Sequence, residues 1–281
     1  MESKLAGKTT LVTGANSGVG LALTRLLLAE GADVIALIRS EFPADDAAIT
    51  QAREQGRLRI YRADFADFDA LRQALRDIQA HEAKIDILFN NAGVAVPGIE
   101  HTPRGHERHF ETNAVAPYII ATELRPLLDK GELKTIINTS SNAQLFVRRF
   151  DLGLMEHPTT YRPIIGPYGA SKLALSLWTQ ALAPELQAEG IAIRSVCPGP
   201  NRTKMSAGKS IPLPLRLLRN MLFVEPEEGA RRTLEAAIGP HRGKVGIFID
   251  NGKAKQVRFG QYGEAVLRRM QQIYQREFVA A

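Results

Sequence analysis

A tyrosine and a lysine one helical turn apart could carry out acid–base chemistry in this chain. The stretch GPYGASKLAL, residues 166–175, places Tyr168 and Lys172 four residues apart, so both side chains lie on one face of a helix. A nearby ammonium stabilises a phenolate and makes a tyrosine a stronger acid. The same spacing occurs on ordinary solvated helices, so the rest of the chain must decide between a catalytic and a structural pair.

A glycine-rich stretch near the N-terminus indicates phosphate binding. TGANSGVG, residues 13–20, has glycines at 14, 18 and 20. These allow a tight turn and a close backbone approach, and the N–H groups at the start of the following helix favour an anion. The spacing is GxxxGxG rather than the GxGxxG fingerprint, so the prediction depends on its position between the first strand and the first helix.

Short apolar runs that alternate with segments of helical period must position these residues. This pattern is typical of βαβ units and a parallel sheet. We expect one α/β domain over residues 1–281, a doubly wound Rossmann-type fold with helices on both faces of the sheet. About seven strands are expected, at residues 9–13, 34–38, 58–61, 85–89, 135–138, 191–196 and 245–249.

Two longer segments interrupt the alternation. We interpret residues 142–167 as an insertion beside a binding site and residues 199–226 as a substrate lid. The second segment is apolar with interspersed arginines, so a membrane surface or a subunit contact is an alternative.

Composition excludes several classes of function. The net charge is +6, but lysines and arginines are scattered and aromatic residues are few, which does not match a nucleic-acid-binding surface. No run approaches the ~20 apolar residues of a membrane span, and no signal peptide is recognised. The one cysteine, Cys197, favours a reducing compartment and the role of a small buried residue, so we expect a cytoplasmic protein.

Five motifs in order resemble the short-chain dehydrogenase/reductase family. They are TGANSGVG, NNAG at 90–93, TSS at 139–141, YxxxK at 168–172 and PG at 198–199. The similarity runs from about Gly7 to Asp250, and GHERHFETNAVAPYIIATEL resembles the NADP-using, retinol dehydrogenase-like branch. The resemblance implies an oxidoreductase that moves a hydride between a nicotinamide and a carbonyl or alcohol, with a hydrophobic small-molecule substrate.

The resemblance also implies roles for four residues. Tyr168 would move the proton, and Lys172 would stabilise the phenolate and hold the nicotinamide ribose. Ser141, preferred over Ser140, would hydrogen-bond the substrate oxygen, and Asn113 would keep a water in line with the lysine for proton relay.

Cofactor choice depends on the end of the second expected strand. NAD enzymes of this fold carry an aspartate there, whereas this chain has Arg39, which can pair with the 2′-phosphate of NADP. Asp64 would contact the adenine and Thr203 the nicotinamide amide. The full set implied for cofactor binding is Gly14, Asn16, Ser17, Gly18, Val19, Gly20, Arg39, Asp64, Phe65, Asn91, Ala92, Gly93, Tyr168, Lys172, Pro198, Gly199 and Thr203.

The remaining features carry weaker expectations. Within the insertion, Phe146, Val147, Met155 and Tyr161 could line a pocket for a bulky apolar substrate. His106 and His109 are interpreted as helix surface rather than a metal pair, and no metal is expected. A C-terminal helix should pack on the body of the protein or on a partner in a homo-oligomer through Val266, Leu267, Met270, Ile273 and Tyr274.

Two alternative functions stay open at this point. The chain could bind NADP as a regulatory or sensor protein without turnover, or perform a non-redox reaction on the same fold.

Overall fold

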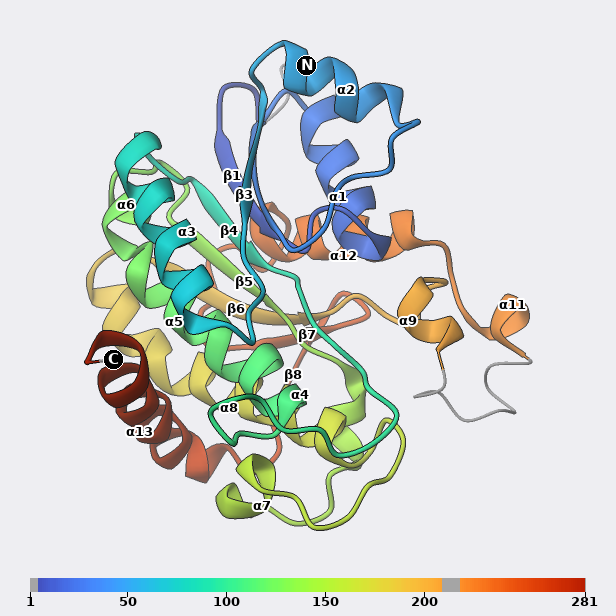
Figure 1. Ribbon diagram of the computed structural model, residues 1–281, viewed down its shortest axis with the longest axis vertical. Coiled ribbons are helices and arrows are strands. Elements are labelled where there is room, and N and C mark those ends of the chain that lie inside the picture. Colours follow the sequence, from blue (N-terminus) through green and yellow to red (C-terminus); the bar gives the residue numbers. More distant parts are fainter. Residues whose placement is uncertain (1–4, 209–217, 281) are drawn as a thin grey trace.

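One eight-stranded sheet forms the centre of the structure. The computed structural model describes residues 5–208 and 218–280. The strand order is β3-β2-β1-β4-β5-β6-β7-β8, parallel except for the β7–β8 pair (Figure 1). The strands are β1 Thr9–Thr13, β2 Asp33–Ile38, β3 Leu58–Arg62, β4 Ile87–Asn90, β5 Thr135–Thr139, β6 Ala192–Cys197, β7 Phe248–Asp250 and β8 Lys253–Lys255.

Helices cover both faces of the sheet, and each face has its own hydrophobic core. One core packs α1 (Gly18–Ala29), α2 (Ala47–Glu54) and α12 (Pro226–Ile238) against the strands. The other packs α3 (Phe68–His81), α5 (Ala116–Glu123), α6 (Arg125–Asp129), α8 (Pro167–Ala188) and α13 (Gly263–Ile273) on the opposite face. Figure 1 shows α1, α2 and α12 apart from α3, α5, α8 and α13, as expected for parallel strands buried on both sides.

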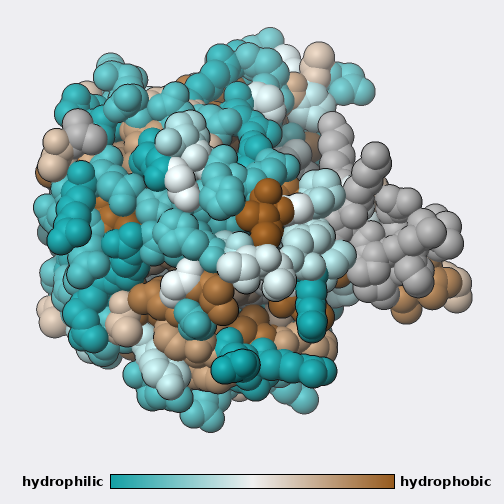
Figure 2. Space-filling view, turned by 60° about the horizontal axis from the view of Figure 1, so that its bottom comes forward, coloured by the Kyte–Doolittle hydropathy of each residue, from teal (hydrophilic) through white to brown (hydrophobic). Residues whose placement is uncertain are grey.

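The interrupting segments form short elements on one side of the sheet. The insertion holds a 3₁₀ turn, η2 (Asn142–Phe146), and α7 (Leu152–Glu156), whereas the lid region holds α9 (Lys204–Ala207) and α11 (Arg219–Leu222). Pro212 and Pro214 of the predicted lid lie outside the described residues. Met221 of α11 is 83% exposed, and Figure 2 shows hydrophobic residues at this edge of the molecule.

Three details differ from the expectation or go beyond it. The last parallel strand begins at Phe248 rather than Val245, because Gly246 has a φ of +67°, outside the range of a strand. The eighth strand, β8, is fully exposed and carries no apolar alternation that would reveal it. The C-terminal helix α13 packs on the protein's own body beside α8, followed by a π-helical turn, η4 (Tyr274–Val279). Among the described residues, no helix is both long and apolar enough to span a membrane.

Candidate active site

A cleft of about 570 Å³ opens at the carboxyl ends of the parallel strands. It lies where the strand order reverses between β1 and β4, the position at which open α/β sheets bind ligands. Every residue predicted to bind the cofactor lines this cleft. The reason is topological: each predicted residue follows the carboxyl end of a strand or begins the next helix, and parallel strands bring these ends together.

The turn between β1 and α1 fits a phosphate group. Gly14 and Gly18 have φ values of +64° and +52°, which only glycine adopts without strain. A Cβ on Gly20 would lie 2.1 Å from the carbonyl oxygen of Gly14, so the backbone is too close for a side chain. No side chain of the described residues caps the start of α1, and its first turn has no acidic residue. The N–H groups there are free to bind an anion.

Arg39 and Asp64 lie together at the rim of the cleft, after β2 and β3. The guanidinium Nη1 of Arg39 lies 3.4 Å from a carboxylate oxygen of Asp64, and both side chains are well exposed. Such a surface ion pair is weak, so Arg39 can exchange it for a phosphate partner. Thr203, which also lines the cleft, caps α9 and lies close to the start of α1, since a Cβ on Gly18 would lie 2.9 Å from its methyl group.

The two serines after β5 point to different places. The Ser140 hydroxyl is buried and bonds the Ser176 hydroxyl at 2.8 Å and the Lys172 carbonyl at 3.1 Å. The Ser141 side chain lines the cleft, as Tyr168 does, and its hydroxyl oxygen accepts the Ala143 N–H at 3.1 Å. This geometry supports Ser141 as the serine available to a ligand.

Burial dominates the proton affinities of Tyr168 and Lys172. It raises the pKa of Tyr168 to about 12, although the hydrogen bond with Ser141 opposes the shift. Burial lowers the pKa of Lys172 to about 8, and its ammonium donates to the Thr139 carbonyl at 2.7 Å. The pKa of Tyr168 thus lies well above neutral pH. At neutral pH the phenol is therefore protonated and able to donate its proton.

Asn113 lies behind the cleft rather than on its surface. It is fully buried in a π-helical turn, η1 (Glu111–Val115), of a kind often found at functional sites. Its amide accepts the Val94 N–H at 2.8 Å and donates to the Val94 carbonyl at 3.0 Å and to Ser171 at 3.1 Å. A Cβ on Gly93 would lie 3.1 Å from Asn113 Oδ1 and 3.3 Å from Lys172 Nζ, so both side chains converge on this glycine.

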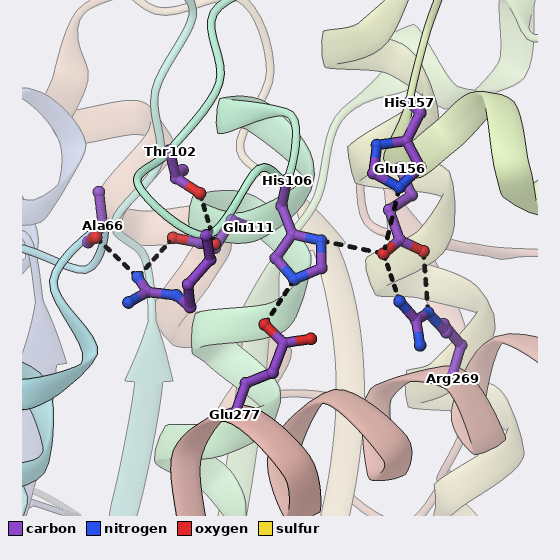
Figure 3. A network of polar contacts seen from close by, with 9 residues as sticks. Ala66, Thr102, His106, Glu111, Glu156, His157, Arg269 and Glu277 are labelled. Atoms are coloured by element: carbon purple, nitrogen blue, oxygen red, sulfur yellow. Dashed lines mark hydrogen bonds and ion pairs between the residues drawn. The ribbon is translucent and has the colours of Figure 1, made fainter. Parts of the chain in front are cut away.

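The interpretation of His106 and His109 as helix surface was wrong. Both are buried, and His106 lies between Glu156 of α7 and Glu277 of η4 at 2.9 and 2.7 Å (Figure 3). Arg269 of α13 pairs with the other side of Glu156. Helix α4 (Arg108–Phe110) is only three residues long, so the chain around it, rather than its own periodicity, buries the two histidines.

Of the four insertion residues expected to line the cleft, two do so. Phe146 and Tyr161 line the cleft, but Val147 and Met155 are packed in the hydrophobic core instead. His109, which was not predicted, also lines the cleft. It precedes Asn113 by four residues, and this helical spacing is the signal that could have identified it. Cys197, the last residue of β6, is buried, as expected.

Comparisons with known proteins agree with this arrangement. A family model described as short chain dehydrogenase matches residues 8–212. Retinol dehydrogenase 14 of Mus musculus is 29% identical, covering 94% of this chain and 84% of its own length. An uncharacterized oxidoreductase of Schizosaccharomyces pombe is 32% identical, covering 85% and 75%.

A solved structure shows the same fold. The blue fluorescent protein from a metagenomic library, in complex with NADPH, has a TM-score of 0.66 and 30% identity, covering 88% of this chain and 96% of its own. A putative betaketoacyl-ACP reductase has a TM-score of 0.61 and 30% identity, covering 89% and 98%. The chain therefore belongs to the short-chain dehydrogenase/reductase family, in its retinol dehydrogenase-like branch, and is an oxidoreductase.

Proposed function

We propose that this oxidoreductase uses NADP to reduce a hydrophobic aldehyde or ketone, or to oxidise the corresponding alcohol. The observation that carries the proposal is the Ser141–Tyr168 hydroxyl pair in the cleft that begins at the uncapped start of α1. Residues 1–281 would then act as one catalytic domain, with the segments 142–167 and 199–226 beside its substrate.

Ser141 and Tyr168 would act together on the substrate oxygen. Both hydroxyls can bind a carbonyl oxygen, which orients the carbonyl and polarises it. NADPH, when bound, supplies the hydride that the carbonyl carbon accepts. Tyr168 then donates its phenolic proton to the developing alkoxide, a step that suits its raised pKa in the reduction direction.

Lys172 and Asn113 would support this proton donor. The ammonium of Lys172, already fixed by the Thr139 carbonyl, has further N–H groups for ribose hydroxyls and for a phenolate. Asn113 holds Val94 and Ser171, which joins the segment after β4 to the helix that carries Tyr168. We propose that Asn113 keeps Lys172 and Tyr168 aligned for proton relay.

Arg39 supports the preference for NADP, and the uncapped start of α1 supports binding of the cofactor's phosphate groups. Arg39 is the cation at the end of β2 and lines the cleft, and the structural relative described above binds NADPH. A hydrophobic substrate is supported by the side chains that line the outer cleft: Phe146, Tyr161, Ile164, Met205 and Phe223.

The test is NADPH consumption over a panel of carbonyl compounds. The panel contains decanal, 4-nitrobenzaldehyde, all-trans-retinal, a 3-ketosteroid and 9,10-phenanthrenequinone, and each is assayed with wild type and with Tyr168→Phe. The proposal expects turnover that falls on the order of 10²-fold or more in the variant, with NADPH binding retained. Bound NADPH without turnover of any compound would instead favour a sensor, and turnover undiminished in Tyr168→Phe would refute the mechanism.

A further inference from the structure

The segment between β4 and α4 forms one wall of the cleft without regular structure. Residues 91–107 all belong to the described part of the chain and form neither helix nor strand, apart from one isolated bridge, His101–Glu107. Val94, Ala95 and Val96 nevertheless line the cleft. Since no ladder of backbone hydrogen bonds holds this wall, other groups must bind its N–H and C=O groups.

Side chains hydrogen-bond both the N–H and the C=O of two residues in this wall, Val94 and Val96, and each such pair of bonds is called a clamp below. Asn113 binds the N–H and the C=O of Val94, as described above. Two residues further on, the Val96 N–H donates to His109 Nε2 at 3.0 Å, and the Tyr161 hydroxyl donates to the Val96 carbonyl at 3.1 Å. The second clamp therefore joins α4 and the insertion to the same residue, Val96.

The partners of the two ring nitrogens fix the tautomer of His109. A backbone N–H can only donate, so Nε2 of His109 must accept and cannot carry a proton. The neutral ring then has its hydrogen on Nδ1, which lies 2.5 Å from a carboxylate oxygen of Glu107. The other oxygen of Glu107 accepts the Phe110 N–H at 2.9 Å, and both Glu107 and His109 are almost completely buried. The ring is thus fixed in one tautomer and one orientation.

His109 also contacts the proposed proton donor. Its ring lies edge-on to the ring of Tyr168, with centroids 6.1 Å apart and an interplanar angle of 78°. One side chain therefore touches both Tyr168 and the Val96 peptide. A shift of this ring would move the wall relative to the phenol.

We propose that His109, held by Glu107, and Tyr161 are positioning residues that fix the Val96 peptide against Tyr168 and so shape the wall on which the carbonyl substrate lies. This inference rests on the proposed function, because it assigns the wall to the substrate of that reaction. Neither residue is required to exchange a proton with the substrate. Their substitution should therefore change substrate binding and orientation more than cofactor binding.

The experiment compares three variants with two controls. His109→Phe removes the acceptor but keeps a flat ring beside Tyr168, whereas His109→Gln places an amide oxygen near the position of Nε2. Tyr161→Phe removes only the hydroxyl. The controls are His81→Gln and Tyr262→Phe, which change exposed residues outside the cleft. Three readouts are used: hydrogen exchange of the Val96 amide, kcat and KM for the panel compound that wild type reduces fastest, and the Kd for NADPH.

The proposal expects a graded result. His109→Phe should speed Val96 exchange by about tenfold or more, the loss of one hydrogen bond, and raise KM by a similar factor. The Kd for NADPH should stay within about twofold of wild type. Tyr161→Phe should raise KM in the same direction, and His109→Gln should restore most of the wild-type exchange and KM. Both controls should match wild type.

Two results would overturn the proposal. One is wild-type KM and wild-type Val96 exchange in both His109→Phe and Tyr161→Phe. The other is a His109→Gln variant as impaired as His109→Phe, since a lost shape rather than a lost acceptor would then be responsible. If His109→Phe does not fold, the Tyr161→Phe and His109→Gln results decide alone. Turnover that survives Tyr168→Phe refutes the proposed function instead. The hydrogen-exchange rates need no substrate, so they still test whether His109 and Tyr161 hold Val96.

Discussion

Replacing Arg39 with alanine should weaken NADPH binding selectively. A hydrogen-bonded ion pair between a guanidinium and a phosphate contributes about 1.5–3 kcal/mol. Arg39 must first leave Asp64, 3.4 Å away, and with side-chain exposures of 60% and 41% that pair is worth at most about 1 kcal/mol. The difference, about 0.5–2 kcal/mol, corresponds to a Kd for NADPH raised about 2- to 30-fold. NADH has no 2′-phosphate, so its Kd should change by less than about twofold.

Fluorescence titration of both cofactors measures this selectivity. Arg62→Ala is the matched control, because Arg62 ends the neighbouring strand β3, pairs with Glu41 in solvent and does not line the cleft. It removes the same charge without removing the proposed contact, and both cofactors should bind it nearly as they bind wild type. Equal losses of NADPH and NADH affinity in Arg39→Ala, or equal losses of NADPH affinity in the two variants, would refute the reasoning.

Three further predictions follow from buried contacts. Gly20→Ala should weaken NADPH binding by about tenfold or more in the same titration, because its Cβ would lie 2.1 Å from the Gly14 carbonyl oxygen. Burial lowers the pKa of His106, but its hydrogen bonds to Glu156 and Glu277 outweigh burial and raise it. The stability that His106 contributes is therefore full below its unfolded-state pKa and is lost as pH rises through the folded-state pKa. Urea unfolding should show His106→Gln destabilised more at about pH 5.5 than at about pH 9, and a larger loss at high pH would contradict this. Arg194 is fully buried and donates to four backbone carbonyls. Arg194→Met should therefore lower the free energy of unfolding in urea by about 3 kcal/mol or more, and a decrease under about 1 kcal/mol would count against this prediction.

Periodicity predicted the parallel sheet, and the resemblance to the short-chain dehydrogenase/reductase family implied the residues that line the cleft. Apolar runs locate the strands, and the family motifs that include Gly14, Arg39, Asn91, Ser141 and Pro198 follow the carboxyl ends of these strands, which a parallel sheet brings together at one edge. The exposed β8 strand gave no such signal, because its residues are all in solvent.

Features that depend on distant segments could not be predicted. His106 is buried by Glu156 and Glu277, which lie far along the chain, and no local pattern around His106 reports them (Figure 3). Val147 and Met155 lie in an insertion without helical or strand period, so nothing in the sequence distinguished the core from the cleft. The raised pKa of Tyr168 likewise reflects burial by the whole fold, whereas spacing to Lys172 indicated only a possible partner.

The most direct test of the central claim follows a label from cofactor to product. Wild type and Tyr168→Phe are incubated with NADPH that carries deuterium at both hydrogen positions of nicotinamide C4 and with the panel compound that wild type reduces fastest, and the product is analysed by mass spectrometry. The account predicts an alcohol with deuterium on the carbinol carbon from wild type, and alcohol formation slowed on the order of 10²-fold or more in Tyr168→Phe although it still binds NADPH. Labelled alcohol formed at the wild-type rate by Tyr168→Phe, or a wild-type product without deuterium, would contradict it.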